Sequence, residues 1–579
     1  MRSQLAISFG QYSGAGAKEA NQDFHGLLVP EGGELVSKGI AVALADGIST
    51  STMGAAAAET AVKSFLSDYY ATSDAWSVQT CAERVIAATN SWMHAHNQRT
   101  HGRTLTDESR ERGMVCTFTG MVFKSRLAHL FHIGDARVAR LSGLSLEPLT
   151  DAYRVYLGGG ESYLGRAMGT DRHVEIDYRQ VPLQAGDVFV LTTDGVHEYL
   201  SDTAIAGIVC GASDLDDAAQ AIAAAALAND SPDNLTVQIL RIESMPDGSL
   251  DDLVGAEATL PPAPQLVPGQ DFEGYAIERE IHSGSRSHVY LARDKASGAR
   301  VAIKVPATDH AHDEAQMQAL LLEEWVARRV SNPHLLQAAP VRDRRAYAYC
   351  VTEYVEGQTL DVWMNDHRQP DLALVRSILG QIARGLQALH RREMIHRDLR
   401  PRNIVINGEA TAKIIDFGSV QVAGLEEVAP GADNSMFAGT MQFSAPELYL
   451  VQPASPVSDI YSLGVIAYRM LTGDLPYGPR LANATTRAAQ RKLRYTPVIE
   501  RNPSVPDWMD AAIAKACAID PGSRYGELSE FVYDLSYPNP ALSGPDALPL
   551  LARNPVLVWQ AISAILGVMV AILLASRGH

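Results

Sequence analysis

The chain contains 579 residues, of which 46% are hydrophobic and 20% are charged, and its formal net charge is -18. This composition is typical of globular proteins with sizeable cores and excludes a chain that is disordered throughout. The acidic balance disfavours a general nucleic-acid-binding protein, because such binding depends on clustered Lys and Arg. The cysteines lie far apart and form no Cys-x-x-Cys pair, which argues against a disulfide framework or a zinc site.

Residues 1–243 alternate between apolar, strand-like runs and alanine-rich, helix-like runs. The strand-like runs are residues 40–47, 126–141, 187–195 and 234–242, and the helix-like runs are residues 53–70 and 214–230. Four aspartates stand at the ends of strand-like runs, each beside Gly or Asn: Asp46, Asp135, Asp194 and Asp233. One Asp-Gly pair alone usually marks a hairpin turn. Four such positions favour convergence on a hard, oxygen-ligated metal site for Mg²⁺ or Mn²⁺.

The order of these motifs resembles the metal-dependent Ser/Thr protein phosphatases of the 2C type across essentially all of residues 1–243. The matching motifs are Lys18-Glu-Ala-Asn21-Gln22-Asp23, Ala45-Asp46-Gly47, Gly134-Asp135-Ala-Arg137, Thr193-Asp194-Gly195 and Asp233-Asn234-Leu-Thr236. The resemblance implies a sandwich of two β-sheets with flanking helices. It also implies hydrolysis of protein phosphoserine and phosphothreonine by a water molecule activated between two metal ions.

The resemblance implies a role for each acidic residue of the metal site, which takes two to three Mn²⁺ or Mg²⁺ ions. The expected ligands are Asp46 as the bridge, the Gly47 carbonyl on one ion, Asp194 and Asp233 on the other, Asp23 directly or through water, and Asp135 with Asp194 at a third, weaker site. Lys18 stands where the family usually has a phosphate-gripping Arg, so a looser phosphate grip is expected. Gln22 stands where the family often has Glu, which predicts weaker binding of one ion.

A Pro- and Gly-rich linker at residues 244–271 precedes a second segment, residues 272–536. Two strand-like runs, 288–294 and 300–305, are joined by a turn, and Lys304 lies within the second run. A buried Lys needs an acidic partner or an anionic ligand. The helix-like run 320–330 offers Glu323 and Glu324.

Two later blocks, residues 395–406 and 412–419, each set a short polar motif beside strand-like residues. Together with Lys304 they resemble the eukaryotic-like Ser/Thr protein kinases over residues 272–536. The match continues through Ala445-Pro446-Glu447, Asp459-Ile-Tyr-Ser-Leu463-Gly464 and Asp520-Pro521 followed by Arg524. The resemblance implies a small β-rich lobe and a larger helical lobe with ATP and Mg²⁺ between them.

The resemblance assigns the kinase roles as follows. Lys304 holds the α- and β-phosphates and pairs with Glu323, Asp398 accepts the substrate hydroxyl proton, and Arg400 stands where a Lys more often contacts the γ-phosphate. Asn403 and Asp416 bind Mg²⁺, Gly284 and Val289 contact the nucleotide, and Glu353 to Val355 form the adenine hinge behind Thr352. Glu447 and Arg524 are expected to form a buried ion pair.

Two features of this segment leave questions open. The three Gly positions of the phosphate loop hold His282, Gly284 and Ser287, which predicts weaker ATP binding without loss of catalysis. The activation segment, residues 419–444, contains Ser435 and Thr440. Phosphorylation of Ser435 and its pairing with Arg397 is a hypothesis, and the alternative is a serine that is merely exposed.

Residues 556–575 contain no charged side chain and follow a Pro-rich stretch at 537–555. As a helix this segment is long enough to cross a bilayer, so a single C-terminal transmembrane helix is predicted, with a buried core helix as the alternative. Gly567 and Ala571 form a small-xxx-small pair, a pattern that favours packing of two such helices in a homodimer. The resulting expectation is a bacterial inner-membrane protein with both catalytic domains in the cytoplasm.

The sequence therefore predicts an α+β multidomain protein that phosphorylates and dephosphorylates protein Ser/Thr, with its own residues as a hypothetical further substrate. Three alternatives remain open. The kinase segment is a non-catalytic nucleotide sensor that governs the phosphatase, or only the kinase is active because of Gln22 and Lys18, or both folds serve only for docking.

Overall fold

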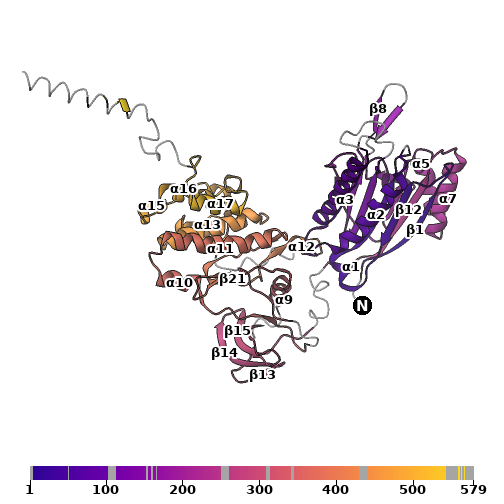
Figure 1. Ribbon diagram of the computed structural model, residues 1–579. Helices are drawn as coiled ribbons and strands as arrows, with labels where there is room; N and C mark the ends of the chain where they lie inside the picture. The colour runs from indigo at the N-terminus through magenta and orange to yellow at the C-terminus, as the bar shows by residue number, and fades with distance from the viewer. Residues whose placement is uncertain are drawn as a thin grey trace, which may run out of the picture. The chain divides into compact units, whose positions relative to one another are not determined.

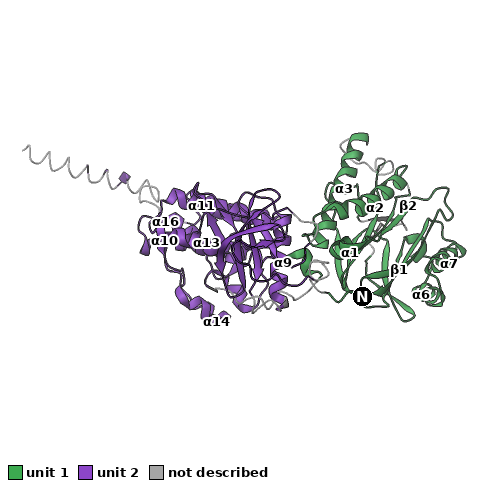
Figure 2. Ribbon diagram, turned by 90° about the horizontal axis from the view of Figure 1, so that it is seen from below, with its two compact units in different colours: residues 1–259, 422–433 green, residues 260–421, 434–579 purple. Residues whose placement is uncertain are grey.

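The computed structural model describes residues 4–49, 51–101, 113–151, 154–157, 161–164, 166–248, 260–307, 313–340, 345–428 and 441–542, with 559–560, 563 and 566. The chain divides into two compact units (Figure 2). Unit 1 comprises Met1–Thr259 and Val422–Asp433, and unit 2 comprises Leu260–Gln421 and Asn434–His579. Unit 1 therefore includes a short stretch, residues 422–433, that is separated in the sequence from its main part by residues 260–421 of unit 2.

Unit 1 contains two antiparallel sheets of five strands each, laid face to face (Figure 1). In order across the first sheet lie β1 (Ala6–Gly14), β12 (Leu235–Ser244), β11 (Val188–Thr192), β6 (Arg137–Ser142) and β7 (Ser145–Pro148). The second sheet has the order β10 (Asp177–Pro182), β5 (Leu127–Ile133), β4 (Phe118–Lys124), β3 (Ile40–Asp46) and β2 (Asp23–Leu28). Val42, Met121 and Leu240 are among the residues of the apolar core between the sheets.

Helices cover the outer faces of both sheets, as predicted for a sandwich with flanking helices. On the second sheet, α2 (Gly54–Ala71) and α3 (Val78–His101) bury alanine and aromatic side chains against β3 and β4. On the first sheet, α6 (Asp202–Gly211) and α7 (Leu215–Ala228) bury alanine and branched aliphatic side chains. The remaining elements are α1 (Gly32–Lys38), α5 (Asp194–His197) and the hairpin β8 (Arg154–Leu157) and β9 (Glu161–Leu164).

The single strand-like run at residues 126–141 is divided between the two sheets. β5 belongs to the second sheet and β6 to the first, with a turn at Gly134 between them. Gly134 has φ +116, and a Cβ there would lie 2.7 Å from side-chain atoms of Thr117. Only Gly tolerates both restrictions. Gly134 therefore permits the turn at which the chain passes from the second sheet to the first, and Asp135 follows directly after it.

Unit 2 begins with a five-stranded antiparallel sheet and one helix. The sheet order is β13 (Asp271–Phe272), β14 (Tyr275–Ser283), β15 (Ser287–Asp294), β16 (Arg300–Pro306) and β17 (Cys350–Glu353), and α9 (Glu314–Arg329) contacts β16 and β17. A helical part follows, and its central helices are α11 (Leu372–His390) and α13 (Pro456–Thr472). The predicted small β-rich lobe and larger helical lobe are therefore present.

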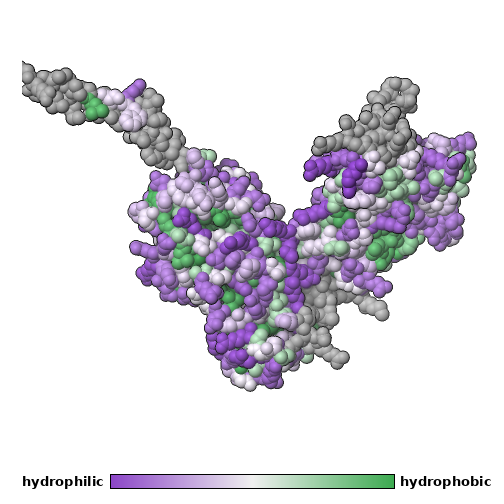
Figure 3. Space-filling view, in the orientation of Figure 1, coloured by the Kyte–Doolittle hydropathy of each residue, from purple (hydrophilic) through white to green (hydrophobic). Residues whose placement is uncertain are grey.

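The helical part also carries short strands and further helices. They are β18 (Gln358–Thr359), α10 (Leu360–Asp366), β19 (Met394–Ile395), η3 (Pro401–Asn403), β20 (Ile404–Ile406), β21 (Ala412–Ile414), β22 (Gln421–Val422), α12 (Ala423–Glu426), η4 (Met441–Phe443), η5 (Pro446–Leu450), η6 (Gly478–Asn483), α14 (Arg487–Gln490), α15 (Val498–Arg501), α16 (Asp507–Ala516), η7 (Pro521–Ser523) and α17 (Leu528–Ser536). On the face shown in Figure 3, hydrophilic residues are interspersed with smaller hydrophobic patches.

Among the residues that the structure describes, no helix has both the length and the apolar character that a bilayer crossing requires. The prediction of a transmembrane helix at residues 556–575 is corrected by this finding, and so is the single-pass inner-membrane location that depended on it. Most of that segment lies outside the described residues, as do Gly567, Ala571, Ser435 and Thr440.

Candidate active sites

Asp23 and Asp46 form the centre of the acidic site in unit 1. They are directly paired across β2 and β3, and opposed residues of an antiparallel pair point to the same face. Oδ2 of Asp23 accepts hydrogen bonds from the hydroxyl groups of Thr193 (3.0 Å) and Thr236 (2.7 Å). Oδ1 of Asp23 is buried and has no hydrogen-bond partner among the described residues. A buried, unsatisfied carboxylate oxygen is suited to a cation.

Four of the predicted metal ligands, Asp23, Asp46, Asp135 and Asp194, lie close enough for their charges to interact. Burial raises the pKa of Asp23 to about 6, and the nearby charge of Asp194 adds to that rise. Burial also raises the pKa of Asp46 well above its ordinary value, reinforced by Asp23, Asp194 and Asp135. Such mutual repulsion between buried carboxylates is relieved when a divalent cation binds among them.

Asp233 lies close to Gly195, the residue after Asp194, and its carboxylate is paired with Lys18. The ammonium group of Lys18 contacts the carboxylate of Asp233 and the hydroxyl group of Ser49. A Cβ on Gly195, the residue after Asp194, would lie 3.0 Å from Cβ of Asp233. The predicted phosphate-binding Lys is therefore at the acidic site, where it neutralises one of its carboxylates.

Gly47 is restricted by packing, and Gln22 is held by a hydrogen bond. A Cβ on Gly47 would approach the backbone of Gly54 to 2.3 Å, so only Gly fits there. The side-chain amide of Gln22 donates to the carbonyl of Ser51 (2.9 Å). Gln22 therefore contributes an amide contact to the loop where a carboxylate is frequent in the resembled family.

Asn234 has a role that the motif alone does not reveal. Its side chain donates to the carbonyls of Ala15 (3.0 Å) and Ala20 (2.9 Å) and accepts from the backbone N–H of Gln22 (3.0 Å). Asn234 thus fixes the loop that carries Lys18. In the sequence, the position of Asn234 directly after Asp233 indicated a turn and gave no sign of these loop contacts.

The acidic site does not contain a complete set of metal ligands from side chains alone. Within the described ranges, no group of three or more His, Cys, Asp or Glu side chains stands ready to hold a metal ion. The donors present are nevertheless all oxygens, which suits Mg²⁺ or Mn²⁺, and these ions commonly keep water and backbone carbonyls as additional ligands. The residues therefore fit a hard cation that completes its coordination with water.

Lys304 is the centre of the charged site in unit 2. Its ammonium nitrogen lies 2.5 Å from Oε2 of Glu323 on α9 and 3.3 Å from Oδ1 of Asp416. Burial alone would lower the pKa of Lys304, but Asp416 and Glu323 raise it above its ordinary value, so Lys304 is charged. Glu324 instead forms ion pairs with Arg328 and Arg345. Of the two glutamates, Glu323 is therefore the one that pairs with Lys304.

Asp398 lies in a loop held by buried Asp459. The backbone N–H groups of His396 (2.9 Å) and Arg397 (3.0 Å) both donate to the carboxylate of Asp459. Arg397 has φ +64, a conformation that a non-Gly residue adopts at a cost. Asp459 offsets that cost, a role that its position in the motif could not show.

Asn403 and Arg400 stand beside Asp398. The side-chain amide of Asn403 donates to the backbone carbonyl (2.9 Å) and to Oδ2 (3.2 Å) of Asp398. Nε of Arg400 lies 3.4 Å from the same Oδ2. Burial raises the pKa of Asp398, which makes it a stronger base, while Arg400 partly opposes that rise.

Asp416 has φ +74 and a carboxylate turned to Lys304. Burial would raise its pKa, but Lys304 and the backbone N–H of Gly418 lower it below the ordinary value. Asp416 therefore stays ionised, as a cation ligand must.

The residues predicted to form the phosphate loop lie in and between β14 and β15, and those predicted to form the adenine hinge lie at the end of β17 and just after it. Val355 follows the end of β17, and the Glu353 carboxylate accepts from Lys413 (2.7 Å) and from the backbone N–H of Gln337 (2.9 Å). β14 and β15 form a hairpin in which His282 pairs with Val289, and the N–H of Gly284 donates to the Ser287 carbonyl (3.1 Å).

Replacing His282 by Gly is expected to lower the KM for ATP. A Cβ on Gly284 would lie 3.0 Å from Nε2 of His282, so the imidazole crowds the loop. A loop free of this ring approaches phosphate more closely and gains on the order of one charge-assisted hydrogen bond, worth up to about tenfold in affinity. Initial rates of ³²P transfer at graded ATP concentrations measure the change, and an unchanged KM would contradict it.

Glu447 and Arg524 form the predicted buried ion pair. Two parallel hydrogen bonds of 2.8 and 2.6 Å join them, and Ser458 donates to the same carboxylate (2.7 Å). The side chains are 4% and 0% exposed. Arg524→Met is expected to destabilise unit 2 by about 3–5 kcal/mol, because Glu447 is left as an uncompensated buried charge. Urea unfolding followed by tryptophan fluorescence measures this loss.

The same pair predicts a pH dependence of stability. Burial would raise the pKa of Glu447, but the bonds from Arg524 hold it below its ordinary value. A lowered carboxyl pKa stabilises the fold above the unfolded-state value of about 4.3, and this stabilisation is lost as the pH falls through the folded-state value. The wild type is therefore expected to lose more unfolding free energy than Arg524→Met between pH 6 and pH 3, values chosen to lie roughly on either side of that range. Equal losses would contradict it.

Comparison with known proteins adds independent findings on both units. A model of the family "Protein phosphatase 2C" matches residues 11–229, and a model of the family "Protein kinase domain" matches residues 275–533. The chain is 30% identical over 283 residues to the serine/threonine-protein kinase PknL of Mycobacterium tuberculosis, which covers 48% of this chain and 69% of PknL. It is 32% identical over 264 residues to the serine/threonine-protein kinase PrkC of Bacillus subtilis, covering 45% of this chain and 40% of PrkC.

A solved structure also aligns with part of the chain. The serine/threonine phosphatase of S. agalactiae aligns with 21% identity and a TM-score of 0.36, covering 41% of this chain and 100% of that structure. The chain spans less than half of the length of several kinases that it matches, among them the probable serine/threonine-protein kinase PknB of Lactococcus lactis, at 41%.

Proposed function

Since the chain belongs to the serine/threonine-protein kinase family and carries a protein phosphatase 2C domain ahead of its kinase domain, we propose that it is a bifunctional enzyme. One domain transfers the γ-phosphoryl group of ATP to protein Ser/Thr hydroxyls, and the other hydrolyses protein phosphoserine and phosphothreonine. We place the phosphatase domain in residues 1–243 and the kinase domain in residues 272–536. The joint contact of Lys304 with Glu323 and Asp416 is the observation that carries the proposal.

In the kinase domain, each charged residue performs one task. Lys304, held by Glu323, positions the α- and β-phosphates of ATP. Asp398 accepts the proton of the substrate hydroxyl group, and its raised pKa favours that transfer. Asn403 and Asp416 would hold Mg²⁺, which neutralises charge on the phosphates when it is bound. Arg400, which contacts Asp398, would neutralise the γ-phosphate.

In the phosphatase domain, the acidic residues would hold the cations and Lys18 would bind phosphate. Asp46, the Gly47 carbonyl, Asp194 and Asp233 are the proposed ligands, with Asp23 and Asp135 beside them. The bound metal ions would lower the pKa of a water molecule and neutralise phosphoryl oxygens. Thr193 and Thr236 orient Asp23 by hydrogen bonds to one of its oxygens.

The alternative of a non-catalytic nucleotide sensor is not favoured. Asp398 and Asn403 bond to each other, and the ion pair of Lys304 is complete. A fold kept only for binding has no need of the base and its amide partner. Substrates are proposed to be proteins, including the chain itself.

Two assays on the purified wild-type protein test the proposal. Transfer of ³²P from ATP to a generic basic protein tests the kinase, and Mn²⁺-dependent hydrolysis of p-nitrophenyl phosphate tests the phosphatase. We expect both activities, and chelation by EDTA should remove both. Absence of either activity in folded protein would refute that half of the proposal.

A further inference from the structure

The activation segment, residues 419–444, supplies part of unit 1. The chain leaves unit 2 after Gln421, and Val422–Asp433 belongs to unit 1. Asp416 stands only a few residues before this crossing. The described portion of the stretch, residues 422–428, is here named the docked strand-helix. It contains α12 and ends at Val428, and its apolar residues Val422, Leu425 and Val428 are buried.

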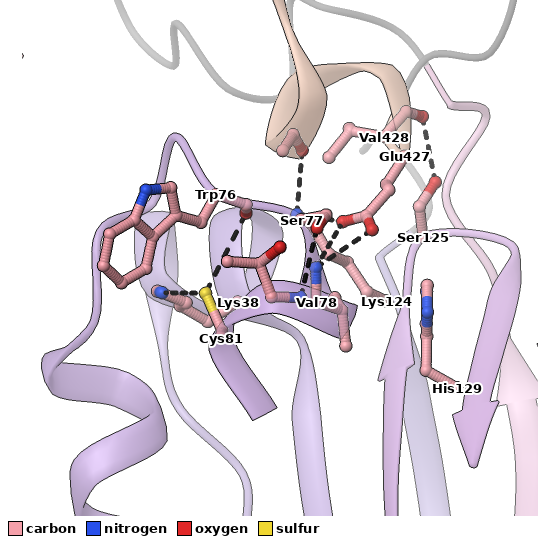
Figure 4. A network of polar contacts seen from close by, with 12 residues as sticks. Lys38, Trp76, Ser77, Val78, Cys81, Lys124, Ser125, His129, Glu427 and Val428 are labelled. Atoms are coloured by element: carbon pink, nitrogen blue, oxygen red, sulfur yellow. Dashed lines mark hydrogen bonds and ion pairs between the residues drawn. The ribbon is translucent and has the colours of Figure 1, made fainter. Parts of the chain in front are cut away.

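The carboxylate of Glu427 binds the N-terminus of α3. Both of its oxygens accept from the backbone N–H of Val78, at 3.0 and 3.1 Å (Figure 4). The first N–H groups of a helix have no partner within the helix, and a negative charge there is favoured by the helix dipole. Glu427 therefore completes a helix end that belongs to the phosphatase domain.

Lys124 at the end of β4 binds the same segment from the other side. Its ammonium group donates to the carbonyl of Gly424 (2.8 Å) and pairs with Glu427 (3.0 Å), as Figure 4 shows for Glu427. The Lys124 side chain is 1% exposed and that of Glu427 is 11% exposed. A cation buried to this degree needs such partners, because removing one leaves an uncompensated charge.

The fit around Gly424 is close. Its N–H donates to the carbonyl of Ala75 (3.0 Å). A Cβ at this position would meet the carbonyl oxygens of Asp74 at 2.6 Å and Trp76 at 2.7 Å. These are backbone atoms, so a larger residue cannot be accommodated by a side-chain movement. The hydroxyl group of Ser125 donates to the Val428 carbonyl (3.0 Å) and completes the contact.

We propose that the phosphatase domain is a docking site for the start of the kinase activation segment, and that docking sustains kinase activity. The contact is built from a buried ion pair, a helix cap and a glycine that no other residue can replace. In the structure with the docked strand-helix in place, Asp416 contacts Lys304 and Lys304 contacts Glu323. Docking fixes the chain shortly after Asp416 and so favours this catalytic arrangement over others.

The inference rests on the proposed function, and it is tested by variants on both sides of the contact in the full-length chain. Lys124→Met and Gly424→Val are expected to lower ³²P transfer to a basic protein by about 5- to 150-fold, the range of ordinary coupling between sites. Hydrolysis of p-nitrophenyl phosphate is expected to continue, which shows that the phosphatase domain is folded. Glu426→Gln, the same segment with an exposed side chain, is the matched control and should retain kinase activity.

Hydrogen exchange provides a second readout that does not depend on activity. In both variants, the amide N–H groups of Val78 and residue 424 are expected to exchange faster than in the wild type, because their acceptors are displaced. Faster exchange with unchanged or increased kinase activity would overturn the proposal. If wild-type protein transfers no phosphate at all, the proposed kinase function fails instead, so the two failures are distinguishable.

Discussion

Replacing Asp398 by Asn is expected to lower ³²P transfer about 10²- to 10⁴-fold, the usual contribution of a general base. Asn retains the shape of the side chain and the position next to Asn403, but it cannot accept the proton of the substrate hydroxyl group. The KM for ATP is expected to change little, because the proposed contacts with the nucleotide phosphates come from Lys304 and the loop rather than from Asp398. Initial rates with a basic protein substrate measure both quantities.

The phosphatase domain supplies the internal control for this variant. Hydrolysis of p-nitrophenyl phosphate by Asp398→Asn should equal that of the wild type, since Asp398 belongs to unit 2. A variant that keeps most of its kinase activity would show that Asp398 is not the base. A rise in the KM for ATP with little change in kcat would assign it to binding instead.

Replacing Asp46 by Asn is expected to lower hydrolysis of p-nitrophenyl phosphate by more than about 100-fold. Loss of a residue that only orients a metal ligand typically costs 10- to 100-fold, and Asp46 is the proposed bridging ligand. Asp46 is also surrounded by other carboxylates that raise its pKa, so an amide there lowers the negative charge that attracts cations. Activity against Mn²⁺ concentration is the measurement.

The same variant links the two activities. If the phosphatase removes phosphate that the kinase adds to its own chain, Asp46→Asn should accumulate more ³²P on itself than the wild type does. A short tether gives each domain a high effective concentration of the other. Glu19→Gln, a change of charge on the same loop as Lys18 but outside the proposed ligands, is the matched control. Equal labelling of wild type and Asp46→Asn would contradict the self-dephosphorylation.

Much of each site could be predicted because its residues stand in short motifs at fixed places in the fold. A buried Lys and a nearby helix predicted an acidic partner for Lys304, the family resemblance implied that this partner is Glu323, and the structure contains the pair. Asp23 and Asp46 were predicted at one site, and they oppose each other across neighbouring strands. In these cases the local sequence determines the strand or helix, and the fold family implies which strands are neighbours.

Other contacts depend on distances that no motif encodes. Asp459 caps the loop of Asp398 from a helix far along the chain, and burial of its charge has no local signature. Lys18 pairs with Asp233 at the opposite end of the domain sequence. The apolar run at residues 556–575 predicted a bilayer crossing from composition alone, and the described helices do not support it.

The docked strand-helix has a consequence for the order in which the protein folds during synthesis. Unit 1 includes residues 422–428, and without them Lys124 and the start of α3 lack the partners described above. A nascent chain that has emerged from the ribosome only as far as residue 421 therefore has an unfinished phosphatase domain. Because N-terminal domains generally fold first, this one should reach its full stability only after much of the kinase domain has been translated.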